Sequence, residues 1–245
     1  MSIEIGFYKK YTSSAVKHFW VTRDSATKKN KEEGKADQGN RGAVTAGKNM
    51  DGFLELIKKT VESNGLEASC VLTDGRTNLT LPGFFRPTKN WDVLVIDGEN
   101  LIAVIEFKSQ VGSFGNNFNN RCEEALGSAT DFNVAFREKV FGKNFKPYLG
   151  YLMLVESNPK SVAPVRCSSP HFSVLEEFEG TSYIERYQIF CEKLVREGLY
   201  DNAALICSDY ETGLKGKYTE PNEFNSVKNL ISGLAAAVSA YVASK

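Results

Sequence analysis

The segment from Trp91 to Lys108 constrains the fold of this chain more than any other, because it contains two apolar strands joined by a tight turn. Asp92 stands at the start of the first strand, and the triplet Glu106-Phe107-Lys108 closes the second. Apolar strands normally keep charge out of their interiors. Three charges gathered at one end of a hairpin therefore favour a metal site over packing alone.

Side-chain alternation predicts which of these residues meet. Successive side chains of a strand point to opposite faces, so Glu106 and Lys108 share one face and Phe107 points to the other. A three-residue loop over 98–100 places Asp92 directly opposite Glu106, with Cβ atoms about 5 Å apart. A two-residue loop shifts the register by one and moves Asp92 to the wrong face. The prediction of one shared site therefore depends on the turn.

Two carboxylates and a lysine around one point suit hydrolysis of a phosphodiester. The carboxylates of Asp92 and Glu106, together with water, are suitable ligands for Mg²⁺, a cation that prefers oxygen. Such a metal polarises a phosphoryl oxygen and lowers the pKa of a bound water. Lys108 can stabilise the charge that develops on the phosphate, or hold the attacking water. An ordinary salt bridge at the end of a surface hairpin explains the same residues, and the hairpin alone does not separate the two interpretations.

The segment 109–121 that follows the hairpin is dense in Gly, Asn and Gln and ends in Arg121. Asn and Gln side chains can read adenine, Arg can read guanine, and all three also bind phosphates. We expect a polar loop here, followed by a helix that begins near Arg121 and is capped by Asn119 or Asn120. An ordinary polar loop with Asn in left-handed positions is the alternative. A loop that leaves the predicted site is nevertheless well placed to meet DNA.

The same residues resemble a known family. Asp92 with the triplet 106–108 resembles the PD-(D/E)xK nuclease signature, which by itself has low specificity. The longer string 105–121 is similar to the XhoI group of Type II restriction endonucleases, and the strings 84–89 and 41–45 are similar too. The resemblance spans most of the chain and implies a restriction-endonuclease-like core.

This resemblance implies roles for particular residues. Asp92 and Glu106 bind Mg²⁺, the main-chain carbonyl of Phe107 is a further metal ligand, and Lys108 serves the attacking water. One departure is Trp91, which stands where the superfamily often has proline but leaves the carboxylate of Asp92 in place. The implied substrate is double-stranded DNA with the palindrome CTCGAG, cut after its first C to leave a 5′ overhang. Cleavage of both strands of a palindrome implies a homodimer, and the resemblance also implies a protecting DNA methyltransferase.

Other residues are candidates for the same chemistry. Glu55, on a helix predicted over 51–61, is a candidate metal ligand, although such a helix needs a polar face in any case. Gln110 shares a face with Lys108 and is a candidate for orienting water or touching the scissile phosphate; a strand-end polar residue is the alternative. Arg121 and Glu124 are spaced as a helical ion pair. The candidates for DNA contact are Arg41, Lys48, Arg86, Lys89, Asn116, Asn117, Asn119, Asn120 and Arg121.

The distribution of charge matters more than its sum. The formal net charge is +0, so global charge does not indicate a nucleic-acid partner. Residues 1–50 nevertheless contain ten Lys and Arg against five Asp and Glu. A local basic patch is sufficient for phosphate contacts, and a solvated basic arm is the alternative. We expect a long polar, basic loop at about 24–48, which orders on DNA.

Helical patterns interspersed with short strands predict an α/β fold with a central mixed β-sheet flanked by helices. We expect helices over 51–61, 119–139 and 183–197, buried strands over 148–156 and 203–207, and a last helix marked by Phe224 to Val238. The 245 residues are enough for one large domain, so we expect a single nuclease domain over residues 1–245.

Cysteine usage and apolar runs bear on the compartment. The five cysteines are scattered without C-x-x-C spacing, which disfavours a zinc site or a disulfide framework and fits a reducing bacterial cytoplasm. No signal peptide is apparent. The apolar run Leu230–Ala243 is shorter than the ~20 residues that a membrane span needs, so a buried helix is expected and no membrane partner.

A Mg²⁺-dependent, site-specific Type II restriction endonuclease is the preferred function. The first alternative is a repair or junction-resolving nuclease with the same three residues and no strict sequence preference. The second is a DNA-binding protein without catalysis, in which the hairpin acids merely pair with Lys108. The two scattered histidines, His18 and His171, disfavour a histidine-dependent hydrolase.

Overall fold

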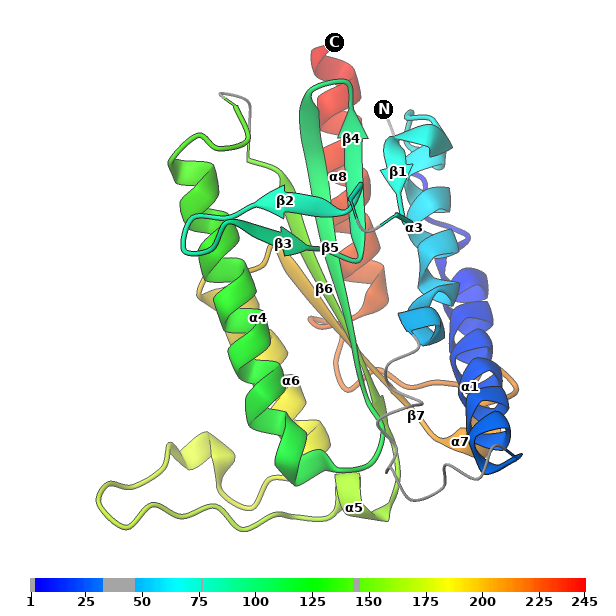
Figure 1. Ribbon diagram of the computed structural model, residues 1–245. Helices are drawn as coiled ribbons and strands as arrows, with labels where there is room; N and C mark the ends of the chain where they lie inside the picture. The colour runs from blue at the N-terminus through cyan, green and yellow to red at the C-terminus, as the bar shows by residue number, and fades with distance from the viewer. Residues whose placement is uncertain (1–2, 33–46, 76, 143–145) are drawn as a thin grey trace.

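Apolar runs form a five-stranded mixed sheet within residues 3–32, 47–75, 77–142 and 146–245, the part of the chain that the computed structural model describes. The strand order is β1-β4-β5-β6-β7 (Figure 1). The pairs β1–β4 and β4–β5 are antiparallel, whereas β5–β6 and β6–β7 are parallel. The predicted α/β class with a central mixed sheet is confirmed.

The element bounds agree closely with the periodic segments of the sequence. The strands of the central sheet are β1 (Val71–Leu72), β4 (Val93–Asp97), β5 (Asn100–Gln110), β6 (Tyr148–Glu156) and β7 (Asn202–Ser208), and a separate two-stranded sheet joins β2 (Thr80–Pro82) to β3 (Thr88–Asn90). The helices are α1 (Tyr8–Glu32), η1 (Gly47–Met50), α3 (Gly52–Ser63), η2 (Ala68–Cys70), α4 (Phe114–Arg137), α5 (Pro159–Val162), η3 (Glu176–Phe178), α6 (Tyr183–Arg196), α7 (Tyr210–Gly213) and α8 (Val227–Ser244).

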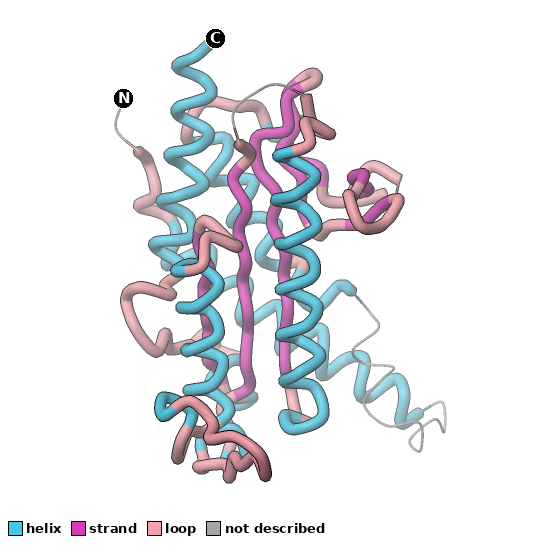
Figure 2. Tube along the Cα trace, turned by 90° about the vertical axis from the view of Figure 1, so that its left-hand side faces the viewer, coloured by secondary structure: helices cyan, strands magenta, loops and turns pink. Residues whose placement is uncertain are grey.

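Helices cover both faces of the sheet, which explains why its central strands are apolar almost throughout. In Figures 1 and 2, α1, α3 and α8 lie on one side and α4 and α6 on the other. Strand β5 divides its side chains between these layers. Ile105 and Phe107 join the core with α3 and α8, while Val104 joins the core with α4 and α6. Alternation therefore places Glu106 and Lys108 on the α4 side of the sheet.

The predicted helix over 51–61 and the predicted helix over 183–197 are both confirmed, with visible local causes. Helix α3 buries one apolar stripe that includes Phe53, Ile57 and Val61. Helix α6 begins with a capping box, in which Ser182 and Glu185 satisfy each other's backbone N–H groups. Such reciprocal caps fix where a helix begins.

The predicted loop at 24–48 is wrong for its first part, because α1 continues to Glu32. Three of the nine residues from 24 to 32 are Lys, which has a high helix propensity. Residues 33–46, and with them Arg41, lie outside the described residues. Lys48 lies in the short helix η1.

Helix α4 also starts earlier than predicted, at Phe114 instead of near Arg121. Phe114 is buried, and its ring stacks on Tyr183 of α6 with centroids 5.8 Å apart. This tertiary contact outweighs the low helix propensity of the Gly and Asn residues that follow. The expected Asn-rich loop is therefore the first two turns of a helix.

Helix α8 is long and apolar enough, by length and composition, to cross a membrane. In the fold it lies against the sheet, and Leu230, Ile231, Leu234 and Val238 are fully buried in the core shared with α1 and α3. The prediction of a buried C-terminal helix is confirmed. Phe224, which was expected to mark this helix, precedes it and is exposed.

Candidate active site

The hairpin of β4 and β5 brings the predicted acids together by a different route from the one expected. Asp97 pairs with Asn100, so the loop has two residues and the predicted three-residue loop is wrong. Gly98 takes a φ of +60°, which suits the first position of a tight hairpin turn. A β-bulge then inserts Ile102, because Val95 pairs with Ala103 while Ile96 pairs with Leu101.

The bulge restores the register that the shorter turn would have lost. Val93 pairs with Ile105, so the next positions along the same ladder are Asp92 and Glu106. The two-residue turn shifts the register by one residue relative to the predicted turn, and the extra residue in β5 shifts it back. Because side chains alternate with a period of two, the two shifts together leave the faces unchanged. The side chain of Asp92 extends toward β5, and its Oδ2 accepts a hydrogen bond from the backbone N–H of Phe107 at 2.7 Å.

Glu106 lies at the centre of a group of charges on the α4 side of the sheet. Its side chain is 2% exposed, and its Oε1 lies 2.6 Å from Nζ of Lys108. Its Oε2 lies 3.2 Å from Nζ of Lys89, which also stands 4.1 Å above the Trp91 ring. Lys89 was expected among the DNA contacts; the structure places its ammonium on the buried carboxylate itself.

Burial and charge act against each other in this group. Burial raises the pKa of Asp92 above its usual value. For Glu106, burial acts in the same direction, but the charges of Lys108 and Lys89 outweigh it and lower the pKa. Burial lowers the pKa of Lys89. For Lys108, burial is outweighed by the charges of Glu106 and Asp92, which raise the pKa. Glu106 and Lys108 therefore stabilise each other as a charged pair.

Glu106, Lys89 and Lys108 open into a pocket of about 390 Å³ between the hairpin and α4. Its lining consists of Arg86, Lys89, Glu106, Lys108, Arg121, Glu123, Glu124, Gly127 and Ser128. Arg121 and Glu124 form the expected helical ion pair, with Nη1 and Oε2 2.6 Å apart. The lining holds four cations and three carboxylates, and this excess of positive charge provides a suitable setting for a phosphate group.

Comparison with known proteins identifies the chain. The family model described as restriction endonuclease XhoI matches residues 29–220. The chain belongs to the XhoI restriction endonuclease family. It is 48% identical over 199 residues to the Type II restriction enzyme XhoI of Xanthomonas vasicola, covering 81% of this chain and 79% of that enzyme. It is 50% identical over 198 residues to the Type II restriction enzyme BstVI of Geobacillus stearothermophilus, covering 78% and 88%. No solved structure matches the chain significantly.

This XhoI-family chain is therefore a Type II restriction endonuclease, an enzyme that cleaves DNA at specific sites. A third relative, the Type II restriction enzyme AbrI of Azospirillum brasilense, is 49% identical over 173 residues, covering 70% of this chain and 77% of that enzyme. Enzymes of this class generally use a divalent metal ion. Membership also disfavours the two alternatives, a repair nuclease without sequence preference and a DNA-binding protein without catalysis.

In the XhoI-family enzyme, four of the residues predicted for catalysis or metal binding do not line this pocket: Asp92, Phe107, Glu55 and Gln110. Glu55 is exposed, lies 3.4 Å from Lys58 and lines a separate hollow beside His18 of α1. No group of three acids, cysteines or histidines suited to a metal occurs within the described part of the chain. Gln110 is buried, and its Nε2 donates to the carbonyl of Gly112 at 2.5 Å, which holds the end of β5.

The predicted DNA-contacting asparagines of the XhoI-family enzyme all lie on the first turns of α4. Asn116, Asn119 and Asn120 are exposed and Asn117 is half-buried. They come shortly after the C-terminal end of β5, the strand that carries Glu106 and Lys108. Their position leaves them available to a ligand beside the pocket.

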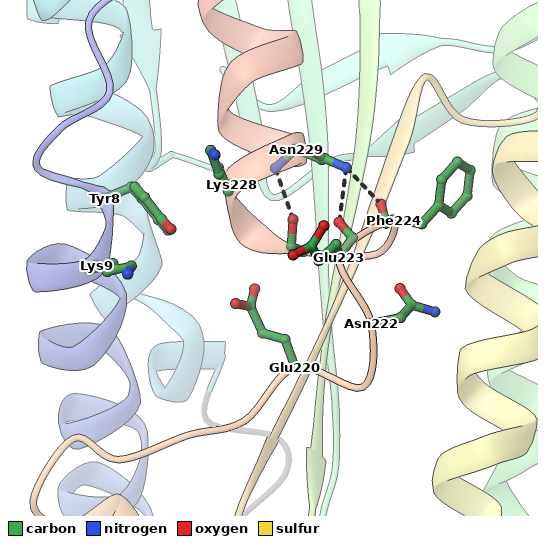
Figure 3. Close-up of a pocket in the computed structure, with 9 residues that line it drawn as sticks. Tyr8, Lys9, Glu220, Asn222, Glu223, Phe224, Lys228 and Asn229 are labelled. Atoms are coloured by element: carbon green, nitrogen blue, oxygen red, sulfur yellow. Dashed lines mark hydrogen bonds between the residues drawn. The ribbon is translucent and has the colours of Figure 1, made fainter.

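Another hollow of the XhoI-family enzyme, about 720 Å³ in volume, lies away from this chemistry. It is formed between α1 and the start of α8, and Figure 3 shows Tyr8, Lys9, Glu220 and Lys228 among its lining residues. Its polar groups serve α8: Oε1 of Glu220 accepts from the N–H of Val227 at 2.5 Å. We assign it a structural role, because Glu220 caps the start of α8.

Sequence reasoning missed Asp131, which ties the β2–β3 hairpin of the XhoI-family enzyme to α4. Its Oδ1 accepts from the N–H groups of Phe84 (2.9 Å) and Phe85 (2.7 Å), and its Oδ2 accepts from Nε of Arg86 at 2.8 Å. The side chain is 5% exposed. Burial opposes its ionisation, but Arg86 and the two N–H groups outweigh burial and lower its pKa.

We expect Asp131→Asn to lower the free energy of unfolding by about 2 kcal/mol at pH 7, because charged hydrogen bonds contribute about that much. A carboxylate whose folded pKa is lowered stabilises the fold above its unfolded pKa of about 4. That stabilisation is lost as the pH falls through the folded value. Urea unfolding at a series of pH values should therefore show the difference between wild type and variant shrinking in acid. Glu99→Gln, on the exposed turn, serves as the control, and a difference that stays constant with pH would contradict the assignment.

Proposed function

We propose that this Type II restriction endonuclease hydrolyses phosphodiester bonds of double-stranded DNA with Mg²⁺, at a site built from Asp92, Glu106 and Lys108. The observation that carries the proposal is the buried carboxylate of Glu106, which is paired with Lys108. Asp92 lies one residue beyond the Val93–Ile105 pair, and its carboxylate is held by the N–H of Phe107. Cleavage after the first C of CTCGAG is the proposed specificity, supported by the family resemblance of the string 105–121.

The donor set fits a divalent cation. Oε2 of Glu106 is buried, and Nζ of Lys89 lies 3.2 Å away as its counter-charge. A buried carboxylate that lines a polar pocket is the type of ligand that Mg²⁺ prefers. We propose Asp92, Glu106 and the carbonyl of Phe107 as its protein ligands. When bound, the metal polarises a phosphoryl oxygen and lowers the pKa of water.

The cations of the pocket would bind the phosphates of the substrate and stabilise the charge that develops during cleavage. Lys108, fixed by Oε1 of Glu106, would hold the attacking water and stabilise negative charge on the scissile phosphate. Arg86 and Arg121 line the same pocket and would hold the neighbouring phosphates. If Oε2 of Glu106 bound the metal, the ammonium of Lys89 would be available to the phosphate. We assign Gln110 a structural role at the end of β5. For Glu55, no contact among the described residues supports a role as a metal ligand.

We assign the reading of bases to the start of α4, with Asn116, Asn117, Asn119 and Asn120, and to the 35–49 segment, which includes Arg41 and Lys48. Amide side chains pair with adenine and guanidinium with guanine in the major groove. We propose one catalytic domain per chain. A palindrome cut on both strands needs two equivalent sites, so we propose a homodimer. We further propose that it acts in the bacterial cytoplasm beside a DNA methyltransferase that protects the same sequence.

The test is a digestion map on DNA of known sequence, in Mg²⁺ and in EDTA. Discrete fragments that all end at CTCGAG are expected in Mg²⁺, with none in EDTA. Fragments that end at another fixed sequence would overturn the proposed target but not the nuclease site. Cleavage that persists in EDTA would contradict the metal mechanism. Sedimentation of the protein with and without target DNA tests the homodimer.

A further inference from the structure

The tip of the β2–β3 hairpin exposes two adjacent aromatic side chains. Phe84 is 49% exposed and Phe85 is 68% exposed, and their rings meet edge to face with centroids 4.9 Å apart. Figure 2 shows this hairpin standing out from the body of the molecule beside α4. Two neighbouring rings held in water favour a binding partner that buries them, whereas isolated exposed apolar residues need no such explanation.

The tip is a rigid mount for these rings. The buried carboxylate of Asp131 accepts hydrogen bonds from the backbone N–H groups of both phenylalanines. The N–H of Gly83 closes the loop on the carbonyl of Pro87 at 3.3 Å. A Cβ at Gly83 would lie only 2.5 Å from Oδ2 of Asp131, so this close approach requires glycine. The rings are thus presented at a fixed place, which lowers the entropic cost of binding.

The position and charge of the tip indicate what covers it. Arg86, the next residue, lines the same pocket as Glu106 and Lys108. The strand that leaves the tip reaches Lys89, whose ammonium contacts Glu106. The segment 82–91 contains these two cations and no acid. A partner that enters the active-site pocket, is negatively charged and offers flat apolar surfaces between its charges matches this tip, and duplex DNA has all three properties.

We propose that the β2–β3 tip is a wedge that meets the base stack of the DNA next to the scissile phosphate. Phe85 stacks on, or inserts beside, a base, Phe84 supports it edge-on, and Arg86 holds the adjacent phosphate. Apolar side chains that enter a base step unstack it and bend the duplex. The wedge rests on the proposed cleavage of duplex DNA. It would let the enzyme select sequences by how easily their base steps unstack, in addition to contacts with base edges.

The test uses target duplexes in which 2-aminopurine replaces, in turn, each position within and next to the target. The Glu106→Gln protein keeps the DNA uncut. We expect 2-aminopurine fluorescence to rise on binding at one position near the cleavage point, and this rise to be lost with Phe85→Ala. Phe85→Ala should weaken binding about tenfold or more, since stacking of a base on an aromatic ring contributes that much. Circular dichroism confirms that each variant is folded.

The matched control is Phe172→Ala, which removes a phenylalanine that is 83% exposed on another surface, and it should change neither signal. Phe85→Leu keeps an apolar side chain without a π face, so it should recover only part of the affinity. Unchanged fluorescence and affinity in Phe85→Ala, with wild type still cutting DNA, would overturn the wedge alone. If Phe85→Ala sedimented as a monomer while wild type sedimented as a dimer, the tip would contact a second copy of the chain, and the wedge would be wrong. A wild type that neither binds nor cuts duplex DNA would overturn the proposed function and the wedge together.

Discussion

Glu106→Gln should lower the rate of DNA cleavage by about 10³-fold or more while target binding is retained. The substitution keeps the shape of the buried side chain but removes the charge to which the proposed metal would bind. It also leaves Nζ of Lys108 and of Lys89 without their shared anion. Binding should be equal or stronger, because one negative charge beside the phosphates is lost. Single-turnover cleavage and a binding titration on the same duplex measure the two effects.

The stability of this variant needs its own measurement. Breaking a buried ion pair costs about 3–5 kcal/mol, so thermal unfolding is recorded alongside activity. Glu106→Asp keeps the charge and moves it by one methylene, and it should retain more stability than Glu106→Gln with greatly reduced cleavage. Glu211→Gln, on the short helix α7, changes an acid outside the pocket and serves as control. Full cleavage by folded Glu106→Gln would disprove the proposed mechanism.

Lys108→Met should reduce cleavage by about 10²–10³-fold, the cost of removing one preorganised group that stabilises charge in a transition state. Methionine fills similar space and removes only the ammonium, which lies 2.6 Å from Oε1 of Glu106. Target binding should weaken only slightly, since one phosphate contact among several is lost. Metal binding should not weaken, because a competing cation beside Glu106 is gone. Single-turnover rates across Mg²⁺ concentrations, with calorimetry of metal binding, separate these effects.

The matched control for this prediction is Lys193→Met. That lysine forms an ion pair with Glu177 on the surface of α6, and such pairs contribute little. We expect its cleavage rate to equal that of wild type. If Lys108→Met cleaved as fast as this control, Lys108 would be a structural partner of Glu106 only. If its cleavage recovered fully at high Mg²⁺, its role would be to hold the metal site in shape.

Local pattern was sufficient for much of the fold. The strand at 148–156 was predicted with its observed bounds, and the helices at 51–61 and 183–197 were predicted to within about two residues. Each of these has an apolar period or a cap that acts within a few residues. The start of α4 was missed, because it depends on the contact of Phe114 with Tyr183, which lies far along the chain.

The active site illustrates the same division. The identities of Asp92, Glu106 and Lys108, and the shared face of the last two, follow from the sequence because strand alternation is local. The place of Lys89 on Glu106, and of Asp131 beneath the β2–β3 tip, could not be predicted, since each joins segments that meet only after the sheet and α4 pack. Glu55 was a reasonable candidate that packing directed to another hollow.

The sequence alone determined the proposed site of this protein: two acids and a lysine on an apolar hairpin, in a string characteristic of the XhoI group. Only the tertiary structure decided how the acids meet. The turn has two residues, which by alternation alone would separate Asp92 from Glu106, and the bulge at Ile102 brings them back to one face. The position of a bulge depends on how β5 packs against β4, β6 and the helices, so it cannot be predicted from the hairpin sequence alone.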